Sequence, residues 1–166
     1  MAGVALIEAL IGMLLVALWL LSSAGLQVSS LKFQSGAASR FTAVALASEL
    51  GERMEANARG VVNGAYALAA TTTPTATQFD CTQIACAPDD MAEYDLSDWS
   101  TRVVANIKQL QSISIVDATP AGGLTTYTIT ISWNEPKGRQ AYEAGANATT
   151  ETMSYVMTKV VRNATV

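Results

Sequence analysis

An apolar run near the start of the chain, GVALIEALIGMLLVALWLL at residues 3–21, limits the possible folds more than any other feature. Glu8 is the single charged residue in it, and the next charged residue is Lys32. A helix over residues 4–28 is about 37 Å long at roughly 1.5 Å per residue, whereas the hydrocarbon of a bilayer is about 30 Å thick. A secretory signal peptide usually has only about 7–15 apolar residues behind a basic segment. The run therefore predicts a membrane-spanning helix.

Glu8 is a candidate functional residue because a carboxylate near the centre of a bilayer costs roughly 2.5–3.5 kcal/mol. One interpretation is that Glu8 pairs with a positive charge of a neighbouring molecule, which offsets the cost of both ions. The other is that Glu8 lies near the headgroups, about 7 Å from the helix start, where it favours the positive end of the helix dipole. Spacing alone does not choose between them.

The helical pattern continues beyond the apolar run. A buried stripe is predicted by apolar residues at three- and four-residue steps, namely Ala43, Leu46, Ala47, Leu50 and Met54. Glu49 with Arg53, and Glu55 with Arg59, are i,i+4 pairs in the favourable order. Gly60 is the expected helix stop. One helix of about 55 residues is expected, which is far above the mean length of about 11–12 and calls for a membrane or a filament.

A second helix is predicted to begin at Pro88 and to extend to residue 110, because proline and acidic residues suit a first turn. Its core-facing positions are Ala92, Leu96, Trp99, Val103, Ile107 and Leu110. Five acidic residues, Asp89, Asp90, Glu93, Asp95 and Asp98, are interpreted as a solvated start and face of this helix. They lack the glycine turn and the ligand spacing of a calcium loop. Residues 61–80 are expected to form a surface loop with a helical turn near Tyr66.

The last third of the chain alternates with period two, which predicts strands. The sequence YTITISW places Tyr127, Ile129, Ile131 and Trp133 on one face. The stretches SISIV and TMSYVMTKVV are also strand-like, with a turn at Gly122-Gly123 and a longer polar link over residues 134–148. The predicted fold class is α+β: a long N-terminal helix packed on a small antiparallel sheet, with a short accessory helix.

Composition argues against several classes of function. The 166 residues carry a net charge of −4 and only 10 scattered Lys and Arg, which is not the footprint of a nucleic-acid-binding protein. There is no histidine, and two cysteines cannot complete a structural zinc site. No catalytic, cofactor or metal residue is assigned. Cys81 and Cys86 are expected to form a disulfide in an exported domain, a metal or redox role being the alternative.

The stretch GVALIEALI at residues 3–11 resembles the cleavage signature of type IV prepilins. The resemblance implies that a prepilin peptidase cuts after Gly3 and methylates the new amine of Val4. It implies that Glu8 pairs with the Val4 amine of a neighbouring subunit, or of its own chain in the membrane, and so sets the subunit register. Gly25 lies where relatives often have a helix breaker, and it is expected to allow local melting during assembly.

Downstream, CTQIACAPDDMAEYDLSDWSTRV and YTITISWNE resemble minor pilins of the PilV-like group, the type IV pilus modification proteins. This resemblance implies a non-enzymatic structural subunit that joins the tip of a type IV pilus and helps to start its assembly. The implied partners are other minor pilins, the major pilin, a tip-associated adhesin and the inner-membrane assembly platform. The alternatives are a minor pseudopilin of a type II secretion system and, from another class, a membrane-tethered periplasmic binding module or small hydrolase.

The chain is accordingly divided into a leader remnant (residues 1–3), a transmembrane or filament-core helix (4–28), an amphipathic continuation (29–60) and an α+β head (61–166). The head is expected in the periplasm before assembly, with the helix in the inner membrane. Met1-Ala2-Gly3 lacks the basic residues of such leaders, and Lys32 and Arg40 lie on the wrong side for the positive-inside rule. A trimmed or altered start is therefore expected.

Overall fold

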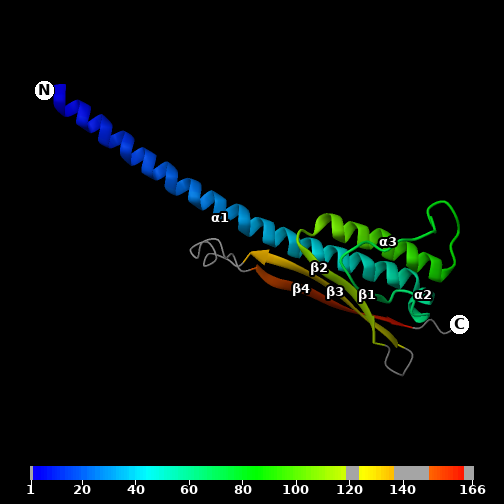
Figure 1. Cartoon of the computed structure of the whole chain (residues 1–166). Helices are drawn as coiled ribbons and strands as arrows, with labels where there is room; N and C mark the ends of the chain where they lie inside the picture. Colours follow the sequence, from blue (N-terminus) through cyan, green and yellow to red (C-terminus); the bar gives the residue numbers. More distant parts are fainter. Residues whose placement is uncertain (1, 119–123, 137–149, 163–166) are drawn as a thin grey trace. The chain divides into compact units, whose positions relative to one another are not determined.

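The computed structural model describes residues 2–118, 124–136 and 150–162. The chain forms two compact units, Met1–Ala38 and Ser39–Val166, and helix α1, Ala2–Ala56, runs through the first and into the second (Figure 1). The structure thus confirms the long N-terminal helix. In the second unit, the four stripe residues Ala43, Ala47, Leu50 and Met54 are fully buried, and Leu46 is 8% exposed.

Helix α1 ends at Ala56, so the predicted stop at Gly60 is wrong. Asn57 interrupts the helix and caps the short helix α2, Ala58–Val62, by accepting a hydrogen bond from the backbone N–H of Gly60 at 3.2 Å. The ion pair of Glu49 with Arg53 forms at 2.8 Å. The predicted pair of Glu55 with Arg59 is not seen, because the helix breaks between the two residues and Glu55 instead binds Lys159 at 2.6 Å.

Gly60 has a packing role in place of the predicted capping role. A Cβ atom at this position would lie 2.8 Å from the Pro88 carbonyl oxygen and 2.6 Å from Asn57 Nδ2, so α2 can approach α3 this closely only with glycine. We expect Gly60→Ala to lower the free energy of unfolding by about 1–3 kcal/mol, because backbone must move. Gly51→Ala is the control, since its Cβ would meet only flexible side-chain ends, Met157 Cε at 2.9 Å and Lys159 Cδ at 3.4 Å. Urea titration of both variants tests this, and equal losses would contradict it.

Four antiparallel strands form one sheet in the order β1-β2-β3-β4: β1, Leu68–Thr71; β2, Leu110–Asp117; β3, Leu124–Pro136; and β4, Thr150–Arg162. The last three confirm the predicted strands. Strand β1 was not predicted, because LAAT has little strand propensity and its pairing with β2 is short and irregular. The Gly122-Gly123 turn and most of the 134–148 link lie outside the described residues.

Helix α3, Pro88–Asn106, begins at the predicted proline and is unbroken. It ends four residues before the predicted end because the chain becomes extended at Ile107, and Leu110 already belongs to β2. Of the predicted core-facing residues, only Leu110 is not fully in the core; it is partly buried.

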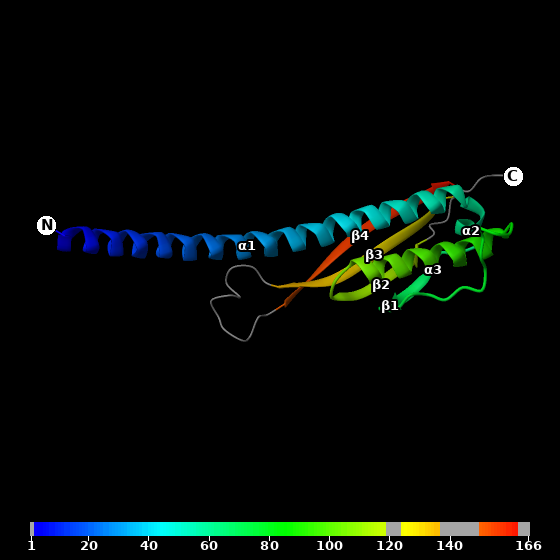
Figure 2. The same cartoon turned by 90° about the horizontal axis from the view of Figure 1, so that it is seen from above.

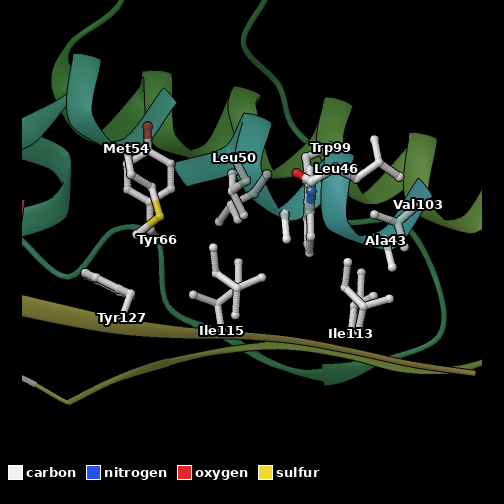
Figure 3. Packing of buried hydrophobic residues seen from close by; sticks show 14 of the residues in the cluster. Ala43, Leu46, Leu50, Met54, Tyr66, Trp99, Val103, Ile113, Ile115 and Tyr127 are labelled. Atoms are coloured by element: carbon white, nitrogen blue, oxygen red, sulfur yellow. Dashed lines mark hydrogen bonds between the residues drawn. The ribbon is translucent and has the colours of Figure 1, made fainter. Parts of the chain in front are cut away.

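The hydrophobic core lies between the sheet and the pair formed by α3 and the second-unit part of α1 (Figure 2). Figure 3 shows Leu50 and Met54 from α1 and Trp99 from α3 above Ile113, Ile115 and Tyr127 of the sheet. Trp99 is fully buried, and its Nε1 donates a hydrogen bond to the Leu46 carbonyl oxygen at 2.9 Å. Trp133 is 2% exposed. The core role predicted for Trp99 is confirmed, and the strand face predicted to carry Trp133 is the one that faces the core.

Candidate functional site

The N-terminal part of α1 presents an apolar surface that nothing in the described chain covers. Residues Ile7–Gln27 form a 21-residue stretch that is long and apolar enough to cross a membrane, and it is the one such stretch among the described residues. It spans about 31 Å, close to the thickness of bilayer hydrocarbon. Large side chains along it are exposed, for example Trp19 at 68% and Leu21 at 71%. Such a surface needs lipid or other apolar helices around it.

The predicted processing and register residues lie on this helix. Gly3 and Val4 are in the first turn of α1, and Glu8 follows Val4 by about 6 Å along the helix axis. The Glu8 side chain is exposed. Gly25 lies within the unbroken helix, and a Cβ atom built there meets no atom within 4 Å. Nothing in the described chain therefore requires glycine at position 25 for packing.

Five charged residues join α1 to α3 in what we name the ion cluster: Glu49, Arg53, Asp95, Asp98 and Arg102. Arg53 binds Glu49 at 2.8 Å, Asp95 at 3.1 Å and Asp98 at 2.6 Å. Arg102 also binds Glu49. Burial lowers the pKa of Arg53, but hydrogen bonds to Asp98, Glu49 and Asp95 outweigh it and raise this pKa above its ordinary value. The cluster keeps Arg53 charged and holds the two helices together.

Asp95 is not part of a solvated helix face, contrary to the interpretation from sequence. It is 7% exposed and accepts a hydrogen bond from the Tyr66 hydroxyl at 2.7 Å in addition to its pair with Arg53. Burial, and then the bond to Asp95, raise the pKa of Tyr66. A sequence signal existed, since Asp95 falls in step with Ala92, Leu96 and Trp99 on the buried face of α3.

A second ion pair, between Arg40 and Glu135, lies where α1 enters the head. Arg40 donates two hydrogen bonds to the Glu135 carboxylate, at 2.8 and 3.2 Å, and Trp133 Nε1 donates a third at 2.8 Å. The pair joins α1 to the end of β3. The Arg40 guanidinium holds the pKa of Glu135 below its ordinary value, and Arg102 does the same for Glu49.

These lowered pKa values predict that the head loses stability in acid. A carboxylate whose pKa is lower when folded binds protons more readily when unfolded, so its stabilising contribution is present above the unfolded pKa of about 4.3 and disappears as the pH falls through the folded pKa. We expect the urea concentration at the midpoint of unfolding to decrease as the pH is lowered below about 4.3. The double variant Glu49→Gln, Glu135→Gln should show a weaker dependence on pH over this range. Equal dependence in both proteins would contradict the assignment.

Cys81 and Cys86 are joined by a disulfide, as predicted. The loop they close lies against the first turn of α3, where Cys81 Sγ is 3.9 Å from the Asp90 carbonyl oxygen. Ile84, in this loop, is 58% exposed. Within the part of the chain that the structure describes, no three His, Cys, Asp or Glu side chains are grouped as metal ligands would be.

Opening the disulfide should destabilise the head without unfolding it. The chain-entropy estimate for so short a loop is about 2 kcal/mol. We expect the paired substitution Cys81→Ser, Cys86→Ser to lower the free energy of unfolding by about this amount. The measurement is urea titration with and without reductant. Reductant should lower the midpoint of the wild type and leave that of the variant unchanged; an unchanged wild type would contradict the prediction.

Part of the chain is similar to a known protein family. The family model described as Tt1218-like, Type IV pilin Tt1218, matches residues 25–97, which is less than half of the chain. The matched range contains most of the ion cluster and the disulfide loop. No curated protein and no solved structure matches this chain. The match supports a type IV pilin, which is a structural and not an enzymatic class of protein, and the exposed apolar helix fits a membrane-anchored one.

Proposed function

We propose that this chain is a minor pilin of the PilV-like group, which joins the tip complex of a type IV pilus and promotes assembly. The observation that carries the proposal is the similarity of residues 25–97 to a type IV pilin. The architecture supports it, because an exposed apolar helix leads into an α+β head whose helices cover one face of the sheet. The head offers a folded surface for contacts, whereas the helix can be shielded only by lipid or by other helices.

In this proposal a prepilin peptidase cuts after Gly3 and methylates the Val4 amine. The apolar helix first anchors the subunit in the inner membrane, with the head in the periplasm, and then packs against the helices of other subunits. Glu8 of one subunit pairs with the Val4 amine of another. Either charge alone would be penalised in apolar surroundings, so the two subunits pack favourably only in the register that brings them together.

The proposed partners are other minor pilins, the major pilin, a tip-associated adhesin and the assembly platform in the inner membrane. Gly25 is proposed as a point at which α1 melts locally during assembly. Glycine there makes the helix about 1 kcal/mol less stable than alanine would. A Cβ atom built at this position meets no atom within 4 Å, so the described chain offers no neighbour against which position 25 packs.

Mass spectrometry of the protein from its native host tests the proposal. Intact mass and N-terminal peptides would be measured on membranes and on filaments sheared from the cell surface. We expect a methylated Val4 as the new N-terminus, and the protein in both fractions, at far lower abundance than the major pilin in the filaments. An unprocessed N-terminus in a protein confined to membranes would overturn the proposal and favour a membrane-tethered binding module.

A further inference from the structure

The connection from β1 to α3, residues 72–87 (Figure 2), begins within a stretch of unusual composition. Residues 69–77 read AATTTPTAT and contain only alanine, threonine and proline. The sequence has no charged residue from Gly60 to Phe79. Threonine-rich segments with proline are typical of chains that carry O-linked sugars. Composition alone does not select one hydroxyl among the several threonines.

The structure distinguishes these hydroxyls by their hydrogen bonds. Among the described residues, the serines and threonines outside helices and strands are Thr72, Thr73, Thr75, Thr77 and Thr82. Two of them pair with other hydroxyls. Thr73 Oγ1 lies 3.1 Å from Thr71 Oγ1, and Thr75 Oγ1 lies 3.2 Å from Ser100 Oγ of α3.

Two further hydroxyls are bound within the connection itself. Thr77 Oγ1 accepts a hydrogen bond from the backbone N–H of Phe79 at 3.1 Å. Thr82 Oγ1 donates a hydrogen bond to the Asp80 carboxylate at 2.6 Å. The Thr72 hydroxyl is the one in this set that makes no hydrogen bond with another described residue. It therefore stands apart from the other threonines of the connection.

Thr72 is also exposed, and the chain around it is held in place. Thr71 Oγ1 accepts a hydrogen bond from the backbone N–H of Thr73 at 3.1 Å, which closes a tight turn with Thr72 at its centre. The backbone N–H of Thr75 donates to a serine hydroxyl of α3 at 2.9 Å. Pro74, between these two anchors, is exposed and disfavours a helical backbone before it. An enzyme can thus reach the Thr72 hydroxyl without opening a helix or the sheet.

We propose that Thr72 is a site of O-glycosylation. In the reaction, Thr72 Oγ1 attacks the anomeric carbon of a sugar that is activated as a diphosphate, and the bond between this carbon and the phosphate oxygen breaks. The diphosphate leaves with the electron pair of that bond, and a basic group of the glycosyltransferase takes the hydroxyl proton. The sugar would add a strongly hydrated group to a stretch without charged residues, 60–79.

The disulfide in the same connection supports this modification. Cys81 and Cys86 are joined, and disulfides persist mainly in oxidising compartments outside the cytosol. Protein-linked sugars are bulky, solubilising surface groups, so an exposed loop of an exported domain can accommodate one. The proposal rests on this connection and not on the pilin function. A failed test of N-terminal processing would leave it standing, and an unmodified Thr72 would leave the proposed pilin function standing.

Mass spectrometry of the full chain purified from its native host tests the proposal. Trypsin cuts after Arg59 and Arg102, and no Lys or Arg lies between them, so Thr72 is contained in the reduced peptide 60–102. We expect this peptide to be heavier by the mass of one or more sugar residues. Electron-transfer fragmentation, which leaves sugars attached, should place the added mass on Thr72. The same chain made by cell-free translation without a sugar donor is the unmodified reference.

Three variants made in the native host complete the test. Thr72→Val keeps the branched side chain without its hydroxyl, so the added mass should disappear, whereas Thr72→Ser should recover it. Thr82→Val is the matched control, because Thr82 is an exposed threonine of the same connection with a bound hydroxyl, and it should keep the added mass. Circular dichroism confirms that the variants fold. An unmodified wild-type peptide, an added phosphate in place of sugar, or a sugar that persists in Thr72→Val would overturn the proposal.

Discussion

Replacing Glu8 by alanine is expected to remove most of this protein from filaments while leaving it in the membrane. In the proposed assembly the substitution leaves the Val4 ammonium of a neighbouring subunit without a carboxylate partner among apolar helices. Removing one partner of a buried ion pair costs about 3–5 kcal/mol, which corresponds to a loss of roughly 100-fold or more in incorporation. The head should be unaffected, because the first unit of the chain, which holds Glu8, ends at Ala38 and the core residues all follow it.

The measurement is the ratio of protein in sheared filaments to protein in membranes, with the methylation state of Val4 determined in both. Glu52→Ala is the matched control, since Glu52 is an exposed glutamate of the same helix but outside the apolar segment. Glu8→Gln removes the charge but keeps a hydrogen-bonding side chain. If the ion pair is what matters, this variant should be incorporated into filaments nearly as poorly as Glu8→Ala. Normal incorporation of Glu8→Ala, with normal processing, would show that Glu8 lies near the headgroups without setting subunit register.

Replacing Trp99 by alanine should have the largest effect on the stability of the head. The side chain is fully buried between α1, α3 and the sheet, and it donates its hydrogen bond to the Leu46 carbonyl oxygen. Truncating a buried tryptophan typically costs about 3–5 kcal/mol through lost burial and the cavity left behind. Since Trp99 of α3 contacts α1, removing its side chain should weaken the packing of residues 39–56 of α1 against α3 and the sheet.

Urea titration of the purified full chain in detergent, followed by far-ultraviolet circular dichroism, measures this effect. Trp19→Ala is the control, because Trp19 is 68% exposed in the apolar segment and should leave the midpoint of the head unchanged. Trp99→Phe should lose less than Trp99→Ala, since it keeps an aromatic ring in the cavity. A Trp99→Ala midpoint equal to that of the Trp19 variant would contradict the central position of Trp99.

Elements whose residues repeat with the period of their own structure could be predicted from sequence. The α1 stripe, the inner face of β3 and the start of α3 at Pro88 all lie where periodicity and helix-start chemistry place them. Each of these signals is local, because it depends on which residues share one face of one element. The apolar segment with Glu8 is equally local, and so it could be identified without coordinates.

Features that depend on contacts between distant segments could not be predicted in this way. Strand β1 has no strand-like sequence and forms because β2 offers it an edge. The sequence places Asp95 among five acids expected on a solvated helix face, whereas Arg53 and Tyr66, far away in sequence, bind its carboxylate in the fold.

Local spacing encodes the long helix, its single early carboxylate, the start of α3 and the alternation of the strands, so these features can be read from the amino-acid order alone. The end of α1, the partners of Asp95 and the place of each strand in the sheet depend on contacts between segments distant in the chain. Those outcomes follow from partners 29 or more residues apart, such as Tyr66 with Asp95, and from a strand order that places β4 beside β3 at the end of the described sheet. A buried charge or a free edge is a property of the whole fold, since desolvation and pairing depend on everything packed around a residue.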